Sequence, residues 1–354
     1  MYPGLFSLIY KIPENLCLMF KLWVMRYTQI GGMEVSQLSL GTWHLPPGSI
    51  RDRDGILNVD VEASNKIFKR AVDLGINFFD TANTYHGTIS ETHLHPEHSG
   101  NAESILGDFI SGQERESIVV ATKVRAEVAR FPNGGGLSRK HIAWQIRESL
   151  KRLKTDHVDL YQIHWEDRKT DPEETMDVLN DIVHRGLAHY IGTSNHPPEV
   201  TEKMLSISRT KGWEKFASMQ ESYNLLDRSF EQTKAGIASR NKLTLLAYVP
   251  LAEGLLTGKY KNGIPSGTRG SYTDGFKARL AETGEKIGNF VQVAHELDVE
   301  PAQLAIAWIL KMQEYLGIRI VPILGATSVK HLESNVEALD INVSDETMMR
   351  LNSI

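Results

Sequence analysis

Short apolar runs alternate with longer amphipathic segments from Val35 to the end of the chain. The apolar runs are rich in β-branched residues, which is typical of strands buried on both faces of a parallel sheet. They lie at residues 35–41, 76–80, 117–124, 158–165, 188–195, 216–222, 243–251 and 318–326. In the segments between them, for example residues 141–153, apolar side chains recur at helical spacing. The pattern therefore predicts parallel strands joined by crossover helices.

Eight strand–helix repeats in 354 residues fit one (β/α)₈ TIM barrel, which needs about 250 residues plus insertions. No linker or charge run interrupts the pattern, so residues 25–354 are expected to form a single domain. The composition, 41% hydrophobic and 23% charged, is that of a globular protein with a large core. The fold class predicted is α/β.

Residues 1–24 stand outside this pattern. Their two apolar runs are interrupted by Lys11, Pro13, Glu14 and Lys21, and each run is too short to span a bilayer. A basic start, one continuous apolar core and a small-residue cleavage site are missing, which argues against a secretory signal. We expect an N-terminal appendage, with Met25 as a candidate natural start and a membrane-touching helix as the alternative.

Charge and cysteine content exclude several classes of partner. The net charge of −5 offers no basic face for nucleic acid, and no membrane partner is expected. Cys17 is the single cysteine, so neither an intramolecular disulfide nor a Cys/His zinc site can form. A cytoplasmic location is expected. The sequence leaves the oligomeric state open, and a homo-oligomer is compatible with it.

Three ionisable residues each end an apolar strand, and a tyrosine follows the first of them. Asp80, Lys123 and His164 close FFD, VVATK and LYQIH, and Tyr85 comes five residues after Asp80. Any one of these residues alone could merely mark the end of a strand. Together they converge on the carboxyl-end rim of a barrel, where active sites lie, and each buried polar group needs a partner there.

The chemistry of this set suits reduction of a carbonyl group. A phenol has a pKa of about 10, so Tyr85 needs a neighbour that stabilises its anion. Lys123 is expected to favour the phenolate, with Asp80 orienting the ammonium, so that neighbouring charge rather than desolvation tunes the phenol. His164 would then position the substrate oxygen. Such a proton source suits hydride transfer to a carbonyl carbon.

These residues resemble those of the aldo-keto reductase superfamily. Its tetrad matches Asp80 and Tyr85 in NFFDTANTY, Lys123 in ATK and His164 in YQIHW. The segments SYNLLDRSFE and LAYVPLAEGLLTGKY most resemble the branch with bacterial aldehyde reductases and potassium-channel β subunits. The resemblance implies a TIM-barrel NAD(P)H-dependent reductase of aldehydes or ketones, with Tyr85 as general acid. A cofactor-sensing regulatory subunit with little turnover is the alternative.

The same resemblance implies a set of cofactor contacts. Residues expected to hold the nicotinamide and the pyrophosphate are Ser194, Asn195, Gln220, Tyr248, Pro250, Leu251, Gly254, Lys259 and Arg269. Those expected near the adenosine 2′-phosphate are Gly325, Thr327, His331 and Asn335. His331, Ser334 and Val249 depart from the residues usual in the family. Because Lys330 or a protonated His331 can pair with the phosphate, NADP(H) is the predicted cofactor, and NAD(H) stays open.

Two connections after strand ends, residues 86–100 and 252–283, are longer than the fold requires. They follow the carboxyl ends of strands, so we expect them to cover a ligand. The first contains His86, His93, His95 and His98, but it also holds a proline and no cysteine, so no metal site is predicted. We expect a lid over the substrate, with Trp43, His86 and Trp165 lining the pocket. A metal-dependent hydrolase or isomerase is the remaining rival.

Overall fold

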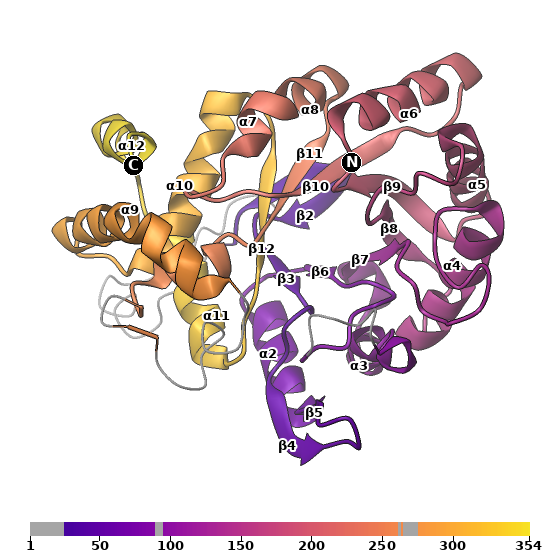
Figure 1. Ribbon diagram of the computed structural model, residues 1–354, viewed down its shortest axis with the longest axis horizontal. Helices are drawn as coiled ribbons and strands as arrows, with labels where there is room; N and C mark the ends of the chain where they lie inside the picture. Colours follow the sequence, from indigo (N-terminus) through magenta and orange to yellow (C-terminus); the bar gives the residue numbers. More distant parts are fainter. Residues whose placement is uncertain (1–24, 89–94, 261–262, 265–274) are drawn as a thin grey trace, which may run out of the picture.

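The computed structural model describes residues 25–88, 95–260, 263–264 and 275–354. In this part of the chain, eight parallel strands close into a barrel (Figure 1). They are β3 (Ser39–Gly41), β6 (Phe78–Asp80), β7 (Val119–Val124), β8 (Val158–Ile163), β9 (Ala188–Ser194), β10 (Phe216–Ser222), β11 (Thr244–Tyr248) and β12 (Ile320–Leu324). The pairing of β12 with β3 closes the sheet, which confirms the predicted (β/α)₈ barrel.

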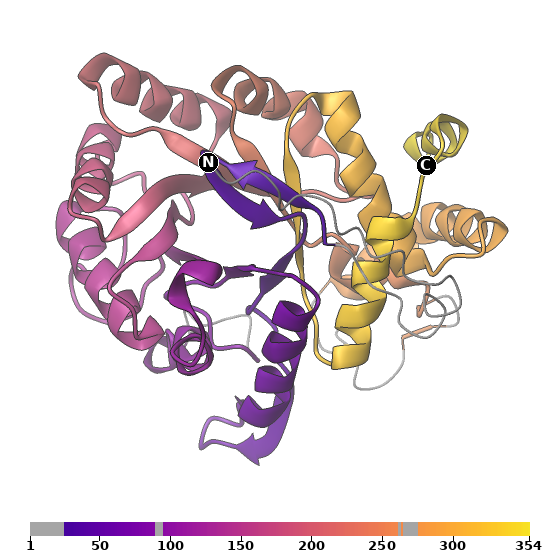
Figure 2. The same cartoon turned by 180° about the vertical axis from the view of Figure 1, so that it is seen from behind.

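Helices surround the barrel in both views (Figures 1 and 2). They are α2 (Val61–Asp73), α3 (Asn101–Ile110), α4 (Arg139–Leu153), α5 (Pro172–His184), α6 (Pro198–Lys211), α7 (Ser229–Thr233), α8 (Ala235–Asn241), α9 (Phe276–Glu296), α10 (Pro301–Leu316), α11 (Val329–Val336) and α12 (Asp345–Asn352). Short 3₁₀ turns are η2 (Pro96–His98), η3 (Arg115–Ser117), η4 (Ala252–Thr257) and η6 (Glu337–Asp340). The predicted helical segment 141–153 lies within α4.

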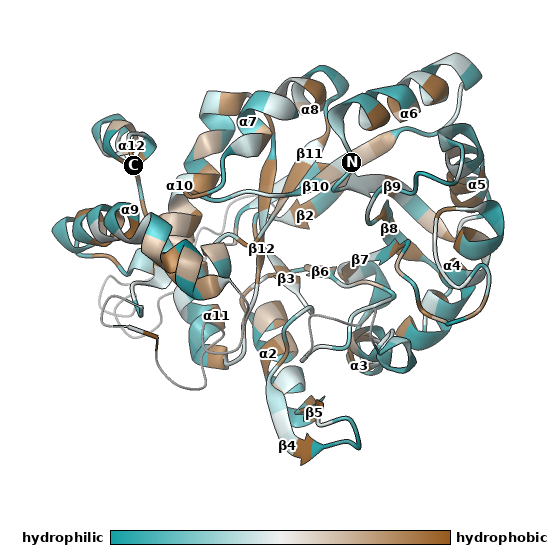
Figure 3. Ribbon diagram, viewed as in Figure 1, coloured by the Kyte–Doolittle hydropathy of each residue, from teal (hydrophilic) through white to brown (hydrophobic). Residues whose placement is uncertain are grey.

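The polarity of the chain follows this layering. Apolar residues concentrate on β11 and β12, whereas the outer surfaces of α4, α5 and α6 are mostly polar (Figure 3). One buried cluster fills the barrel interior, including Phe78, Leu160 and Leu246. A larger one packs the helices against the outside of the strands and includes the fully buried Trp308. Burial of these two layers is what fixes the strand ends in space.

The first predicted strand, residues 35–41, is in fact two elements. Residues Met33–Ser36 form β2, which pairs antiparallel with β1 (Tyr27–Ile30), and only Ser39–Gly41 joins the barrel as β3. The hairpin closes the amino-terminal end of the barrel, because Ile30 and Val35 are fully buried in the interior cluster. A run that is continuously apolar does not reveal where the chain turns from one sheet into another.

Two further features were not predicted. A second hairpin, β4 (Pro47–Arg51) with β5 (Leu57–Val59), projects beside α2 (Figure 1). The long connection predicted over 252–283 is wrong at its end, because α9 begins at Phe276. The first turns of α9 bury little besides Phe276, so the helical period there is weak.

Within the described residues, no helix combines the length and apolar character needed to cross a membrane. Residues 1–24, predicted as an appendage, lie outside the described part of the chain.

Candidate active site

The side chain of Lys123 joins the polar groups at the carboxyl-end rim of the barrel. Lys123 is fully buried, and its Nζ donates hydrogen bonds to Asp80 Oδ1 at 2.6 Å and to the carbonyl of Thr81 at 2.8 Å. Its third donor reaches the Tyr85 hydroxyl oxygen at 3.1 Å. Neighbouring strands β6 and β7 supply Asp80 and Lys123, so the barrel holds the ammonium between the carboxylate and the phenol.

His164 completes the cluster from the end of β8. Its Nε2 lies 3.5 Å from the Tyr85 hydroxyl oxygen, and its Nδ1 is buried with no hydrogen-bond partner among the described residues. The ring of Trp165 stacks on it with ring centroids 3.6 Å apart. The structure thus brings together Asp80, Tyr85, Lys123 and His164, which are far apart in the sequence.

Burial is the largest influence on the ionisation of these groups. It raises the pKa of Tyr85 well above its ordinary value, and the negative charge of Asp80 raises it further. Burial, with the positive charge of Lys123, lowers the pKa of His164 well below its ordinary value. This differs from the expectation that neighbouring charge outweighs desolvation at Tyr85, because loss of water disfavours the phenolate and the nearby carboxylate disfavours it further. The phenol is protonated and the imidazole neutral near pH 7.

Two glutamines hold the carboxylate of Asp80 from the other side. Gln220 Nε2 donates to Asp80 Oδ2 at 2.8 Å, and Gln162 Nε2 lies 3.4 Å from the same oxygen. Gln220 was expected only as a nicotinamide contact, and Gln162 was not expected at all. A signal for it exists, because Gln162 is polar within a buried strand and lies two residues before His164, on the same face.

A second polar group lies at the ends of β9, β10 and β11. Tyr248 OH donates to Asn195 Oδ1 at 2.7 Å, and Asn195 Nδ2 donates to Ser194 Oγ at 2.9 Å and to the carbonyl of His164 at 3.1 Å. Asn195 takes a left-handed φ of 55°, and its N–H donates to Glu221, which pairs with Lys234 at 2.7 Å. The Asn195 amide is thereby fixed beside His164, so the residues fit a planar amide such as the nicotinamide carboxamide.

The segment after β11 has an unusual backbone. Val249, Ala252, Glu253 and Gly254 all have positive φ, at 55°, 47°, 57° and 95°. Within this turn, the N–H groups of Ala252 and Gly254 donate to the carbonyls of Val249 and Leu251, each at 2.9 Å. Pro250 and Leu251 lie in this turn, and the exposed Lys259 that follows it offers a positive charge that fits a pyrophosphate. Arg269 lies outside the described residues.

The predicted adenosine site lies between β12 and α11. Gly325, Thr327 and His331 are exposed, and a Cβ added at Gly325 would meet nothing within 4 Å. Thr327 Oγ1 and His331 Nδ1 are 3.4 Å apart, and Ser328 caps the helix by accepting from the His331 N–H. Asn335 is different, because it is only 5% exposed. The exposed residues surround the first turn of α11, where an anion is favoured.

The histidine-containing connection meets the β4–β5 hairpin. His98 Nε2 pairs with Asp52 Oδ2 at 2.9 Å, and His95 lies near Asp54 and Glu97. The ring of His86 lies 5.0 Å from that of His98, and its Nδ1 bonds with Thr88 Oγ1 at 2.8 Å. The described side-chain contacts of His86 are thus with Thr88 and His98 of the same connection. They do not include Tyr85, although that residue directly precedes His86. Trp43 packs on His44, and His93 lies outside the described residues.

A closed parallel barrel whose carboxyl-end rim holds a half-buried phenol beside a buried ammonium, carboxylate and imidazole has the construction of a (β/α)₈-barrel enzyme. The aldo/keto reductase family model matches residues 37–354. The chain therefore belongs to the aldo/keto reductase family, and it is an oxidoreductase.

Three relatives illustrate the range of similar proteins. An L-glyceraldehyde 3-phosphate reductase of Escherichia coli (strain K12) is 33% identical, over 89% of this chain and 87% of its own length. The uncharacterized oxidoreductase YrpG of Bacillus subtilis (strain 168) is 33% identical, over 93% and 96%. A probable voltage-gated potassium channel subunit beta of Oryza sativa subsp. japonica is also 33% identical, over 90% and 92%. Proteins named as reductases and as channel subunits are thus equally similar to this chain.

Proposed function

We propose that this protein reduces an aldehyde or ketone to the alcohol, with Tyr85 as the general acid. The observation that carries the proposal is the Lys123 Nζ, 3.1 Å from the Tyr85 hydroxyl oxygen and 2.6 Å from Asp80 Oδ1. A phenol that is protonated at rest, with a cation in contact, is a proton donor whose anion is stabilised as it forms.

Each member of the cluster has a distinct task in this proposal. A bound reduced nicotinamide supplies the hydride to the carbonyl carbon. Tyr85 gives its proton to the carbonyl oxygen, and Lys123 stabilises the phenolate that results. Asp80 holds Lys123 charged, and the neutral His164, 3.5 Å from the Tyr85 hydroxyl oxygen, positions the substrate oxygen by a hydrogen bond.

The proposed coenzyme is NADP(H). Ser194, Asn195 and Gln220 would hold the carboxamide, and the half-buried ring of Tyr248 would stack on the nicotinamide. The turn at 249–254 and Lys259 would hold the pyrophosphate. The first turn of α11 offers the cationic side chain of Lys330 and the imidazole of His331 for a 2′-phosphate, which NAD(H) lacks.

A small hydroxylated aldehyde is the proposed substrate class. The polar histidine-containing connection follows Tyr85 directly, and one relative is named for the reduction of L-glyceraldehyde 3-phosphate. Trp165, 39% exposed and stacked on His164, would supply one apolar wall. Trp43, two residues after β3, and the buried His86, at the start of the connection that follows Tyr85, complete the proposed pocket.

The test is reduction of a panel of small aldehydes, followed by the absorbance of NADPH. We expect turnover by the natural protein, and Tyr85→Phe should lower kcat by about 10²-fold or more while leaving coenzyme binding measurable by fluorescence. Unchanged turnover in Tyr85→Phe would reject Tyr85 as the acid.

A regulatory role is the second candidate, because a channel β subunit is as similar as the reductase. In that case the barrel would bind NADPH and sense its oxidation state with little turnover. Tight NADPH binding without oxidation by any aldehyde of the panel would favour this role over that of an enzyme.

A further inference from the structure

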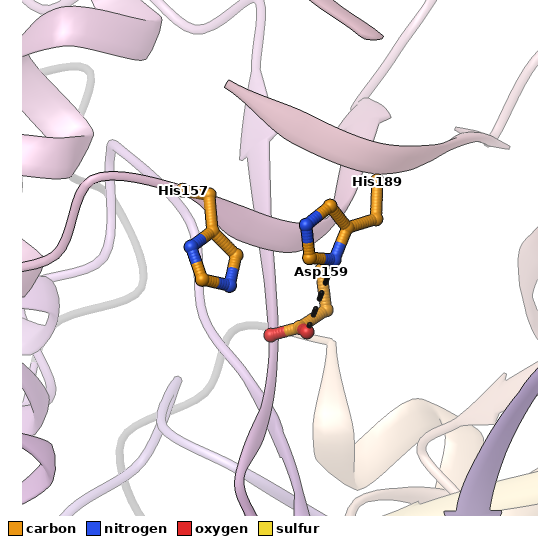
Figure 4. Close-up of side chains that lie close together, drawn as sticks. All are labelled: His157, Asp159 and His189. Atoms are coloured by element: carbon orange, nitrogen blue, oxygen red, sulfur yellow. Dashed lines mark ion pairs between the residues drawn. The ribbon is translucent and has the colours of Figure 1, made fainter. Parts of the chain in front are cut away.

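Three metal-ligating side chains converge at the amino-terminal end of the barrel, away from the active site. They are His157, Asp159 and His189, from the start of β8 and from β9 (Figure 4). One nitrogen or oxygen atom of each lies within 4.8 Å of those of the other two. The proposed function uses none of these residues.

The strand register dictates this convergence. Val158 pairs with Ala188 and Leu160 with Tyr190, so Asp159 and His189 are neighbours across two parallel strands. Because side chains alternate along a strand, His157, two residues before Asp159, lies on the same side. The backbone therefore presents two imidazoles and one carboxylate at one place.

Neighbouring groups orient two of these side chains for coordination. His157 Nδ1 bonds with Asp156 Oδ1 at 2.7 Å, which fixes the proton on Nδ1 and leaves the lone pair on Nε2. Asp159 Oδ2 accepts from Arg115 at 2.7 Å and from the Val120 N–H at 2.8 Å. Oδ1 of Asp159 is then left to face His189. Histidine and carboxylate side chains that bind metal ions characteristically have such hydrogen-bond partners on their other polar atoms.

Among the described residues, the atoms that face the centre of the cluster make no hydrogen bond, and one long ion pair joins two of them. His157 Nε2 is buried and has no hydrogen-bond partner among the described residues, and the residue is only 9% exposed. His189 Nδ1 lies 3.7 Å from Asp159 Oδ1, too far for a hydrogen bond. Ligand atoms around Zn²⁺, each about 2.0–2.1 Å from the ion, lie roughly 3.3 Å apart in a tetrahedron. The distance of 3.7 Å between His189 Nδ1 and Asp159 Oδ1 is close to that. The rings of His157 and His189 stack with centroids 4.4 Å apart and planes at 27°, so the 46% exposed His189 side chain has to turn for both nitrogens to face one ion.

Space for further ligands lies beside the cluster. A cavity of about 480 Å³ is bordered by Asp159 and His189, and also by the carboxylates of Glu34 and Glu116. Water from this cavity can reach a fourth coordination position, and the two carboxylates add negative charge that attracts a cation.

We propose that His157, Asp159 and His189 bind a divalent transition-metal ion of the zinc class. Two imidazole nitrogens and one carboxylate oxygen are ligands that Zn²⁺ accepts, with water in the remaining position. The ion links β8 to β9 at the end of the barrel remote from Tyr85. His157 and His164 are seven residues apart along β8, about 23 Å at the rise of a strand. The ion therefore contributes to stability, and the reduction does not require it.

The test uses the full chain, stripped of metal with a chelator and titrated with Zn²⁺ by calorimetry. We expect one equivalent to bind and to raise the melting temperature in a concentration-dependent way. Outer partners of metal ligands are worth about 10–100-fold in affinity, so Asp156→Ala, at a 94% exposed side chain, should weaken binding by that factor. His189→Gln removes a direct ligand and should weaken binding by more than about 100-fold.

Two control variants locate the ion. His184→Gln changes an exposed histidine of α5 outside the cluster and should bind zinc like the natural protein. His98→Gln changes the other histidine–aspartate group, near Asp52 and Asp54, and should also leave binding intact. Absence of binding by the natural protein, undiminished binding by His189→Gln, or loss of binding in His98→Gln instead would each overturn the proposal.

Discussion

Lys123 donates to Tyr85 from a position with no solvent exposure, 3.1 Å from the phenol oxygen. Its charge is balanced by Asp80 at 2.6 Å, so the pair is a buried ion pair. Removing one partner of such a pair leaves an uncompensated buried charge. The ion pair that is proposed to act in the reduction is therefore also needed for the stability of the fold.

We predict that Lys123→Met lowers the free energy of unfolding by about 3–5 kcal/mol, because Asp80 is left buried without its cation. Urea denaturation measures this. The double variant Lys123→Met with Asp80→Asn should recover part of the loss, and Lys151→Met, at a 70% exposed side chain, should stay within about 0.5 kcal/mol of the natural protein. Equal stability of Lys123→Met and Lys151→Met would contradict the buried ion pair.

Acid should destabilise the fold through its buried histidines. Burial lowers the pKa of His196 from 6.5 to about 4, so above pH 6.5 the residue is neutral in both folded and unfolded chains. Below pH 6.5 the unfolded chain binds the proton first, and stability falls until the pH passes about 4, by about 3 kcal/mol for this residue. Urea denaturation between pH 8 and 4 measures the slope. His196→Gln should flatten it, and an unchanged slope would contradict this assignment.

The hydroxyl of Tyr248 is predicted to support coenzyme binding through Asn195. Tyr248→Phe keeps the ring and removes the 2.7 Å hydrogen bond to Asn195 Oδ1. Since one neutral hydrogen bond is worth about 0.5–1.5 kcal/mol, the dissociation constant for NADPH should rise about 2- to 10-fold. Fluorescence titration measures it, and Tyr248→Ala should weaken binding further because the ring is lost. Equal binding by all three proteins would remove Tyr248 from the coenzyme site.

Coenzyme preference is predicted to depend on the first turn of α11. Lys330 is exposed there, and an exposed charge pair is worth up to about 1 kcal/mol. Lys330→Met should therefore weaken NADPH binding about 5-fold and leave NADH binding unchanged. Parallel titrations with the two coenzymes measure the ratio. A variant that loses affinity for both equally would show that Lys330 does not discriminate through the 2′-phosphate.

The sequence predicts the barrel because eight apolar runs alternate with helical segments, and this pattern needs no knowledge of long-range contacts. The β4–β5 hairpin was missed, although Asp54 and Gly55 form a typical turn dipeptide and Gly55 has a φ of 79°. The division of 35–41 between β2 and β3 was missed for a deeper reason. Both parts are buried, so the pattern of apolar residues does not change where one sheet gives way to the other.

The site, like the fold, could be predicted from the sequence only in part. Asp80, Lys123 and His164 could be placed together because each ends a strand, and the ends of parallel strands share one rim. The ionisation of Tyr85 could not be predicted, because the amount of surrounding protein that raises its pKa is known only once the barrel closes. Likewise, His157 and His189 become neighbours only through the register of β8 and β9.

The β1–β2 hairpin fills the amino-terminal end of the barrel with the side chains of Ile30 and Val35. In the described part of the chain, this hairpin and the packed interior leave no passage along the barrel axis, so in the proposed reaction both coenzyme and substrate would have to enter from the carboxyl-end rim. An ordered sequence would follow from that single entrance, in which the molecule bound deeper binds first and leaves last.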